Sequence, residues 1–290
     1  MATKVVLITG SSSGIGLATA VLLAYDTEKR FKVYATMRNL AKKQQLETEG
    51  KDFLGDTLIV KQLDVCEDDS VNKAVKDVIE QEGRIDVLIN NAGMSLFTVF
   101  ESIPMELMKK CFEVNYFGTV RCTKAVIPYM KAKESGHIIN ISSHAGVVGF
   151  PTAEIYSSTK FAVEGLTESM APTLRQFNIR CTIIEPGPVD TPMKDSNNFI
   201  EGVDLSSADP KTVLIRDRVI SRWGTFWAQP DKVLTAPQVA EAIKEAILSE
   251  NPNFRYQTNK RYCPDEIEAK LADITGNKPV DIITKRFCAE

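Results

Sequence analysis

The 290-residue sequence predicts an α/β protein with a single doubly wound domain, in which helices cover both faces of a central parallel sheet of about seven strands. Three observations predict this class. Short β-branched runs alternate with longer helical patterns, as they do in successive βαβ units. No linker divides the two halves of the chain. The apolar fraction of 43% and the charged fraction of 25% are typical of a globular protein that buries a sizeable core.

The individual elements follow from this alternation in chain order. Runs rich in Val, Ile, Leu and Thr predict strands, and segments whose apolar residues recur every three or four positions predict helices. In the first half we expect strands at residues 4–9, 32–36, 57–63 and 86–90, and helices at 15–25 and 70–82. In the second half we expect helices at 105–131, 155–176 and 237–249, and strands at 137–142, 180–185 and 254–257.

Between residues 188 and 237 the pattern loosens, because five prolines and several polar breaks separate the apolar clusters. Long irregular insertions in compact domains usually serve a function. We therefore expect residues 188–237 to form a substrate lid. Residues 260–290 are expected to be a C-terminal extension, with a helix at 266–274 and a tail near the substrate mouth or a subunit interface.

Composition and charge exclude several classes of function. With 35 basic and 38 acidic residues and a net charge of −3, the chain has no electrostatic signature of nucleic-acid binding. Its six cysteines form no Cys-x-x-Cys pair, which indicates reduced thiols and a cytoplasmic protein. His137 and His144 are too few histidines for a histidine-based metal site or a Ser-His-Asp triad, so no metal is expected. No segment approaches the roughly 18 apolar residues of a membrane span. A small ligand is the expected partner.

A glycine-rich turn joins the first expected strand to the first expected helix, with Gly10, Gly14 and Gly16 in the spacing Gly-x-x-x-Gly-x-Gly. Glycines here permit a tight turn and let the backbone approach a pyrophosphate, which then lies at the positively polarised helix N-terminus. The turn is completed by Ser12, Ser13 and Ile15. The segment predicts a Rossmann-type dinucleotide site, although a plain connector could have the same composition.

The ends of the next three expected strands carry side chains suited to the same cofactor. Arg38 stands about 20 residues past the glycines, where an acidic residue would bind the 2′-hydroxyl of NAD and an arginine accommodates the 2′-phosphate of NADP. This position favours NADP(H); a solvated surface arginine is the alternative. The other strand-end residues are Asp64, Val65, Asn91, Ala92 and Gly93.

Tyr156 and Lys160 are four residues apart in an expected helix, so the phenol and the ammonium lie on one face about one turn apart. A nearby cation favours the ionised form of a phenol, whose free pKa is about 10. Ser143 lies 13 positions before the tyrosine, behind a run that is expected to be a strand. The same Tyr-x-x-x-Lys spacing also occurs on ordinary helix surfaces, so this interpretation depends on the other motifs.

Together these motifs resemble the short-chain dehydrogenase/reductase family: Thr-Gly-x-x-x-Gly-x-Gly, Asn-Asn-Ala-Gly, a serine before Tyr-x-x-x-Lys, and Pro-Gly after the sixth strand. The resemblance covers roughly residues 3–190. It implies that Tyr156 is the acid/base and that Lys160 lowers its pKa and binds the nicotinamide ribose. It also implies that Ser143 hydrogen-bonds the substrate oxygen and that Asn115 holds a water linking the lysine to solvent.

The resemblance further implies hydride transfer between NADP(H) and an alcohol or carbonyl compound. Pro186, Gly187 and Val189 would line the nicotinamide, and Thr191 would contact its carboxamide or the pyrophosphate. The full expected cofactor set is Gly10, Ser12, Ser13, Gly14, Ile15, Gly16, Arg38, Asp64, Val65, Asn91, Ala92, Gly93, Tyr156, Lys160, Pro186, Gly187, Val189 and Thr191.

Residues 33–38, 156–165 and 185–189 are similar to the branch of the family that contains 17β-hydroxysteroid dehydrogenase type 1 and photoreceptor-type retinol dehydrogenase. An apolar alcohol or carbonyl, such as a steroid or retinoid, is therefore expected. The steroid enzyme holds the far end of its substrate with a lid histidine, and residues 188–237 contain none. The expected substrate contacts are Ser143, His144, Phe150, Phe199, Trp223, Phe226 and Trp227. Packing of the lid onto the body would explain the aromatic residues equally well.

Other functions remain open at this point. One is a broad carbonyl reductase of small ketones and aldehydes, and another is an epimerase or lyase that uses the same tyrosine. A non-catalytic NADP-sensing scaffold is a third, although such a protein should have lost part of the set formed by Asn115, Ser143, Tyr156 and Lys160. By analogy with the family, a homodimer is expected through the long helices at 105–131 and 155–176.

Overall fold

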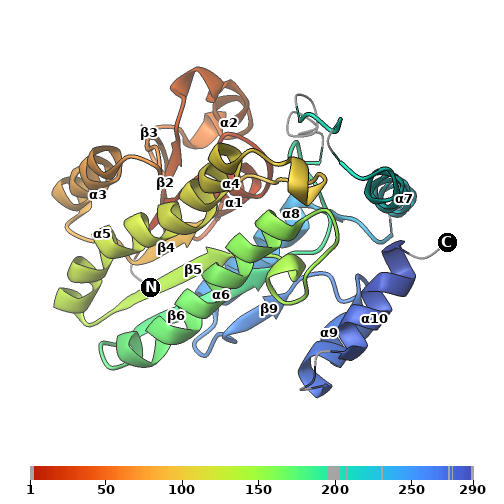
Figure 1. Cartoon of the computed structure of the whole chain (residues 1–290). Helices are drawn as coiled ribbons and strands as arrows, with labels where there is room; N and C mark the ends of the chain where they lie inside the picture. Colours follow the sequence, from red (N-terminus) through yellow and green to blue (C-terminus); the bar gives the residue numbers. More distant parts are fainter. Residues whose placement is uncertain are drawn as a thin grey trace.

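The computed structural model describes residues 3–194, 203–206, 208–229, 231–273, 275 and 277–288. Its centre is a seven-stranded parallel sheet in the order β3-β2-β1-β4-β5-β6-β9 (Figure 1). The strands are β1 (Lys4–Ile8), β2 (Phe31–Met37), β3 (Leu58–Gln62), β4 (Val87–Asn90), β5 (Gly136–Ile141), β6 (Ile179–Glu185) and β9 (Arg255–Gln257). The predicted α/β fold is confirmed, and each strand begins and ends within one residue of its expected bounds.

The strand order reverses between β1 and β4. From β1 the chain runs to β2 and β3 on one side, and it then returns to β4 on the other side of β1. Open α/β sheets bind ligands at such a reversal, outside the carboxyl ends of the strands. The glycine-rich turn follows β1 at this edge.

Helices cover both faces of the sheet because successive strand residues point to opposite sides. Val6 and Ile8 of β1 pack with α1 and α8, whereas Val5 and Leu7 pack with helices of the other face. The first layer comprises α1 (Gly14–Ala24) and α8 (Ala236–Leu248), and the second comprises α3 (Asp68–Glu82), α5 (Gly118–Lys133) and α6 (Glu154–Arg175). Strands covered on both sides are nearly all apolar, as β4 is.

The long helix expected at residues 105–131 is divided into three parts. It consists of α4 (Met105–Phe112), a π-helical turn (Glu113–Phe117) and α5. In the turn the Gly118 N–H bonds the carbonyl of Glu113, five residues back. Single π turns inside helices often mark functional sites, and this one carries Asn115. The helical periodicity of the sequence did not reveal this π-helical turn.

The expectation of an irregular segment at 188–237 is wrong for its central part, which forms α7 (Pro210–Trp227). Pro210 occupies the first turn, where its missing N–H costs nothing, and Asp209 caps the helix by accepting from the amides of Lys211 and Thr212 at 2.9 and 3.2 Å. This proline starts a helix rather than breaking one. Figure 1 shows α7 beyond the carboxyl ends of the strands, beside the C-terminal helices.

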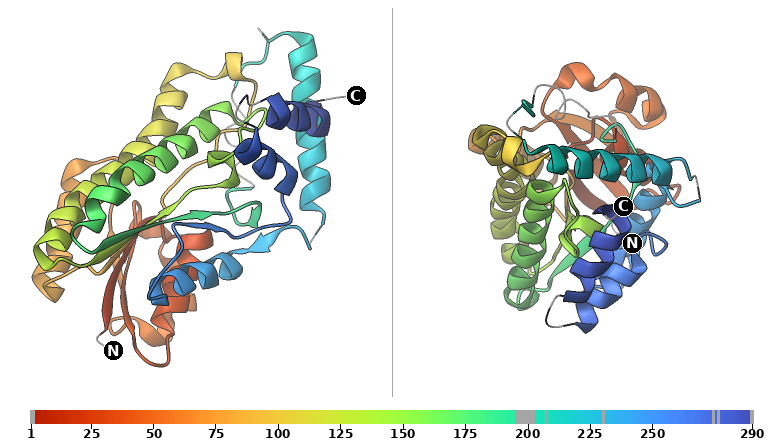
Figure 2. Two further views of the ribbon diagram at one scale, coloured as in Figure 1. Left: turned by 90° about the horizontal axis from the view of Figure 1, so that it is seen from below. Right: turned by 45° about the vertical axis from the view of Figure 1, so that its right-hand side comes forward.

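The C-terminal segment contains α9 (Pro264–Ala272), α10 (Asn277–Ile283) and a π-helical turn (Thr284–Cys288). The two views of Figure 2 place it next to α7, and Arg222 of α7 donates to the carbonyl oxygens of Lys285 and Arg286. The remaining short elements are α2 (Gln44–Glu49), β7 (Val189–Asp190), β8 (Leu234–Thr235) and 3-10 turns at Leu40–Lys42, Lys51–Phe53, Phe100–Ser102 and His144–Gly146. Across the ranges given above, no helix is long and apolar enough to cross a membrane.

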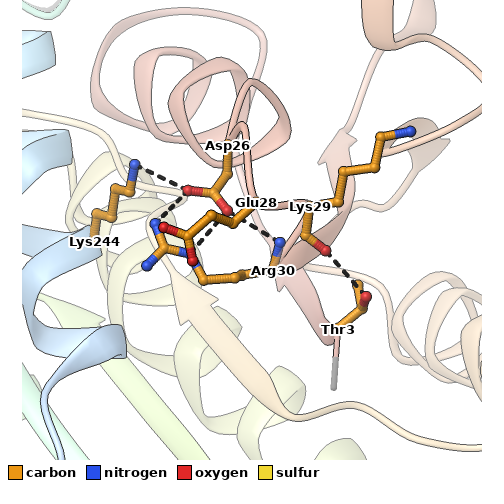
Figure 3. Close-up of polar contacts among 6 residues, drawn as sticks. All are labelled: Thr3, Asp26, Glu28, Lys29, Arg30 and Lys244. Atoms are coloured by element: carbon orange, nitrogen blue, oxygen red, sulfur yellow. Dashed lines mark hydrogen bonds and ion pairs between the residues drawn. The ribbon is translucent and has the colours of Figure 1, made fainter. Parts of the chain in front are cut away.

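A buried ion cluster ties α1 to β2 and α8 (Figure 3). The carboxylate of Asp26, 2% exposed, accepts from the backbone N, Nε and Nη2 of Arg30 at 3.0, 2.9 and 2.5 Å. Lys244 of α8 adds an ion pair at 3.4 Å. The cluster joins the helix layer to the sheet at the end opposite the glycine turn.

Candidate active site

The glycine-rich turn packs directly against the end of β4. Gly10 has a φ of +72°, which favours glycine, and a Cβ on it would lie 2.7 Å from the Ala92 Cα. A Cβ on Gly16 would lie 2.3 Å from the Asn91 Nδ2. Larger residues at these positions would push the first helix away from the strand ends.

Thr9 and Asn91 hold this turn by hydrogen bonds. The Thr9 hydroxyl accepts from the amides of Asn91 and Ala92, both at 3.0 Å. The Asn91 side chain donates to the carbonyl oxygens of Thr9 and Gly10, both at 2.9 Å. Asn91 thus shapes the turn in this structure. Sequence reasoning included Thr9 in the Thr-Gly motif but gave it no role, although its position directly after β1 was a usable signal.

The start of α1 is suited to a phosphate group. Ser13 precedes the helix in an extended conformation, with a φ of −165°, and within the described chain its side chain makes no capping bond. Its hydroxyl and the first-turn N–H groups are therefore available to an anion. Thr191 comes close from the segment after β6, with its methyl carbon 3.2 Å from where a Gly14 Cβ would be. These residues fit the pyrophosphate of a dinucleotide, and the half-buried Ser12 and Ile15 complete the turn.

The remaining strand-end residues lie along the same edge of the sheet. Arg38 is exposed directly after β2, and its guanidinium forms no ion pair with any described residue. The Asp64 carboxylate follows β3 and accepts from the Cys66 amide at 3.0 Å. Val65 is buried against Gly118.

Ser143, Tyr156 and Lys160 converge at the ends of β5 and β6. The Ser143 hydroxyl accepts from the Ala145 amide at 3.1 Å and lies 3.5 Å from the carbonyl oxygen of Pro186. It also lies close enough to the Tyr156 phenol to oppose the rise in the phenol's pKa. Lys160 Nζ donates to the carbonyl of Ile141 at 2.9 Å and lies 5.7 Å from the centroid of the Tyr156 ring. Two hydroxyls and an ammonium therefore share one small region.

The electrostatics of this group differ from the expectation that Lys160 lowers the pKa of Tyr156. Burial raises the pKa of Tyr156 to about 12, against an opposing effect of the Ser143 hydrogen bond. Burial also lowers the pKa of Lys160 to about 8. The physical reason is that the ammonium points to the Ile141 carbonyl, so desolvation of the phenol dominates.

Asn115 connects the π turn to this region. Its side chain pairs with the backbone of Met94, accepting from the amide at 2.8 Å and donating to the carbonyl at 2.9 Å. It also donates to the Thr159 hydroxyl at 3.0 Å, next to Lys160. A Cβ on Gly93 would lie 3.4 Å from Asn115 Oδ1 and 3.8 Å from Lys160 Nζ. Asn115 thus fixes the loop after β4 against the helix of Tyr156.

An aromatic cluster lies over Tyr156. Phe97 packs on the Tyr156 ring with centroids 5.5 Å apart, and Trp223 of α7 meets Phe97 edge-on at 4.8 Å. Within the described chain the indole N–H of Trp223 has no acceptor. Phe97 was missed by sequence reasoning, because it lies in a loop outside every motif.

A second group of aromatic side chains is centred on Tyr262, which sequence analysis also missed. Its ring stacks on His144 and Phe150 with centroids 5.6 and 5.8 Å apart, and Phe226 meets it edge-on at 4.8 Å. Burial lowers the pKa of His144 to about 4, so this side chain is neutral. Trp227 is half-buried at the end of α7. Phe199 lies outside the described residues.

The segment after β6 joins the carboxyl edge of the sheet to this cluster. The Pro186 carbonyl accepts from the His144 amide at 2.9 Å. A Cβ on Gly187 would lie 3.3 Å from the Tyr262 Cβ, and Val189 is buried in β7. The three residues expected at the nicotinamide thus run from Ser143 towards the C-terminal segment.

Comparison with known proteins places this site in a family. Residues 4–200 match the short chain dehydrogenase family. The chain is 42% identical to retinol dehydrogenase 8 of Bos taurus over 281 residues, which are 95% of this chain and 88% of that protein. It is 37% identical to 17-beta-hydroxysteroid dehydrogenase type 1 of Homo sapiens over 289 residues, which are 97% of this chain and 84% of that protein.

Comparison with solved structures finds similar folds in members of the same family. A short-chain dehydrogenase from Streptomyces avermitilis is 28% identical, with a TM-score of 0.75 over 98% of this chain and 97% of that one. ElxO with NADP bound is 27% identical, with a TM-score of 0.71 over 93% and 100%. A short chain dehydrogenase/reductase from Burkholderia phymatum in complex with NAD shares the fold at 24% identity, with a TM-score of 0.76 over 100% and 97%. The fold, the strand-end site and these matches lead to one conclusion: this chain belongs to the short-chain dehydrogenase/reductase family of oxidoreductases.

Proposed function

We propose that this chain interconverts an apolar alcohol and its carbonyl compound with NADP(H), and that the substrate is of the retinoid or steroid type. One observation carries the proposal. The hydroxyls of Ser143 and Tyr156 lie together beside Lys160, underneath an aromatic cluster and next to a turn that fits a dinucleotide pyrophosphate. We therefore propose that the proton donor and the bound cofactor lie on either side of an apolar substrate.

Tyr156 is the proposed proton donor in reduction. Because burial keeps its pKa near 12, the phenol is protonated at neutral pH and can donate to the substrate oxygen. Ser143, whose hydroxyl lies beside the phenol, is proposed to hydrogen-bond that same oxygen and to stabilise the charge that develops on it. Lys160 supplies the positive charge that stabilises the phenolate left behind, and Asn115 is proposed to hold the water that reconnects the lysine to solvent. When bound, the cofactor supplies or accepts the hydride.

NADP(H) is proposed over NAD(H) because Arg38 is exposed and unpaired among the described residues at the position of the 2′-substituent. A guanidinium binds a phosphate with paired, charge-assisted hydrogen bonds. Asp64, Val65, Ala92 and Gly93 line the neighbouring strand ends, where the adenosine and ribose would lie. The cofactors of the solved relatives support a nicotinamide dinucleotide of either kind.

The substrate class is proposed from the aromatic side chains over Tyr156. Phe97 and Trp223 offer apolar surface directly above the phenol, and the Trp223 N–H can donate to a polar group of the substrate. His144, Phe150 and Phe226 border the same region through Tyr262. Relatives named for retinol and for a hydroxysteroid support a large apolar substrate.

The proposal is tested by turnover of all-trans-retinaldehyde, estrone and small ketones with NADPH and with NADH, using Tyr156→Phe as the matched control. We expect reduction of a large apolar carbonyl, with NADPH preferred and the variant inactive. Faster turnover with NADH throughout would refute the role of Arg38. A preference for small ketones would instead support a broad carbonyl reductase.

Two further expectations are proposals of the same kind. We propose a homodimer through the outer surface of α4, α5 and α6, where Phe117, Tyr129 and Phe161 are exposed. Light scattering would measure its mass.

We also propose a reducing compartment such as the cytoplasm, since Cys66, Cys111, Cys122, Cys181 and Cys263 are free thiols.

A further inference from the structure

A buried cluster of charged side chains lies beneath the proposed site and has no part in the chemistry described above. Glu164 of α6 and Glu185 of β6 have side chains 8% and 0% exposed, and both bind Arg255, the first residue of β9. One guanidinium nitrogen, Nη1, donates to Glu164 Oε2 and to Glu185 Oε1, the latter at 2.8 Å. The other nitrogen pairs at 2.9 Å with Glu168, which is mostly exposed.

This cluster reaches the proposed catalytic residues from two sides. Glu164 follows Lys160 by one helical turn, and Lys160 follows Tyr156 by one turn, so all three lie on one face of α6. Glu185 directly precedes Pro186, whose carbonyl oxygen lies 3.5 Å from the Ser143 hydroxyl. Arg255 therefore anchors both the helix and the loop that meet at the site.

Lys160 is a further buried cation beside this cluster. When both carboxylates are ionised they face one guanidinium, which leaves one negative charge in excess. Lys160 is 6% exposed, and it forms no ion pair with the described residues. Its ammonium is the nearest cation on the same helix face, and an unbalanced buried charge is costly.

Few other titratable groups face this region. From α4, Cys111 faces Lys160, and burial raises the pKa of its thiol to about 11, so it is neutral. Tyr156 is the neighbour on α6 itself. Facing Glu164 are Glu185 of β6, Arg255 of β9 and Glu168 of α6. Among the residues that the structure describes, Glu164 is thus the buried carboxylate that acts most directly on Lys160.

We propose that Glu164 is a positioning residue that keeps Lys160 in its charged form, and that Arg255 fixes the Glu164 carboxylate in place for this purpose. The consequence for catalysis rests on the roles proposed for Tyr156 and Lys160. The electrostatic statement about Lys160 stands on the arrangement of the buried charges.

The pKa values of the two groups support this coupling. Burial lowers the pKa of Lys160 to about 8, and the Cys111 thiol and Glu164 counteract that effect. Burial raises the pKa of Glu164 to about 7, with the Ser142 hydroxyl opposing and the Glu185 carboxylate reinforcing the shift. The two groups therefore titrate in overlapping ranges, and ionisation of Glu164 favours the charged lysine.

The test is an NMR titration of Lys160 in protein labelled with ¹³C at the lysine Cε atoms, with the resonance assigned from the spectrum of Lys160→Arg. In Glu164→Gln we expect the midpoint of the Lys160 titration to fall by about one pH unit. Its charged fraction at pH 8 would then fall about fivefold. Glu168→Gln is the matched control, because Glu168 lies on the same face of α6 and binds the same arginine but is mostly exposed. It should leave the midpoint nearly unchanged.

An unchanged midpoint in Glu164→Gln, or an equal fall in Glu168→Gln, would overturn the proposal. If Glu164→Gln does not fold, the wild-type protein still decides. Its Lys160 resonance should show a second inflection near pH 7 from Glu164, and a single inflection would refute the coupling. Neither measurement needs a substrate. Absence of turnover with every carbonyl would refute the proposed function alone.

Discussion

Replacement of Asp26 by asparagine should destabilise the fold by an amount that the geometry of its ion cluster indicates (Figure 3). The carboxylate is 2% exposed and accepts three hydrogen bonds from Arg30, and it forms a further ion pair with Lys244. Asparagine keeps the shape but has one acceptor oxygen and no charge. Arg30 and Lys244 would then lack their buried counter-ion.

The free energy of unfolding is expected to fall by about 3 kcal/mol. Removing one partner of a buried ion pair costs roughly 3 to 5 kcal/mol. The lower end applies because the Arg30 and Lys244 side chains are each 21% exposed and can regain some water. For a chain of this length, we expect the Tm to fall by roughly 6 to 10 °C.

Thermal unfolding followed by circular dichroism measures this effect. The matched control is Asp56→Asn, because Asp56 pairs with Lys29 on the surface, where the two side chains are 68% and 73% exposed. Surface pairs contribute little, so the Tm of the control should change by no more than about 1 to 2 °C. Equal changes in the two variants would refute the reasoning from burial.

The same prediction has a pH dependence with a defined sign. Hydrogen bonds from Arg30 hold the pKa of Asp26 well below its usual range in the folded protein. Its contribution is therefore complete above about pH 4 and is lost as the pH falls towards the folded-state pKa. At pH 3 the difference in unfolding free energy between the wild type and Asp26→Asn should have narrowed by about 1 kcal/mol. A difference that stayed constant down to pH 3 would contradict the assignment.

The other predictions concern the proposed site. Tyr156→Phe should lower kcat by about 10²- to 10⁴-fold with little change in cofactor affinity, measured by steady-state rates and fluorescence titration; near-normal turnover would exclude the phenol as acid. Arg38→Asp should raise the KM for NADPH by roughly 10- to 100-fold and spare NADH, because a charge-assisted phosphate contact is lost. Trp223→Ala should raise the KM for a large apolar carbonyl by roughly 10-fold or more without affecting a small ketone; equal effects on both would indicate a packing role only.

Much of the first half of the fold was predictable because its signals are local. Gly10 and Gly16 follow closely on the strand that positions them. The alternation of strands and helices predicts a parallel sheet, and such sheets bind ligands at their carboxyl edge. Tyr156 and Lys160 are one helical turn apart, so their proximity follows from the sequence. Each of these inferences depended only on the spacing of residues within a short stretch of the sequence.

The lid region was harder to predict because a proline can either interrupt a helix or occupy its first turn. We interpreted Pro210 as an interruption of helical structure. In the structure, Asp209 caps an 18-residue helix that begins at Pro210. The same local evidence is consistent with either outcome. Packing of α7 against the C-terminal segment, through contacts such as those of Arg222, selects the helix.

The sequence alone determined the fold class, the family and the candidate Ser143, Tyr156 and Lys160 set, because periodicity and motif spacing encode them. Tertiary structure alone brought Phe97 over Tyr156 and joined Arg255 to Glu164 and Glu185. It also decided that burial, and not the neighbouring lysine, dominates the pKa of Tyr156. Desolvation and buried ion pairing depend on which distant segments exclude water from a side chain. The spacing of residues along the chain does not reveal which segments these are.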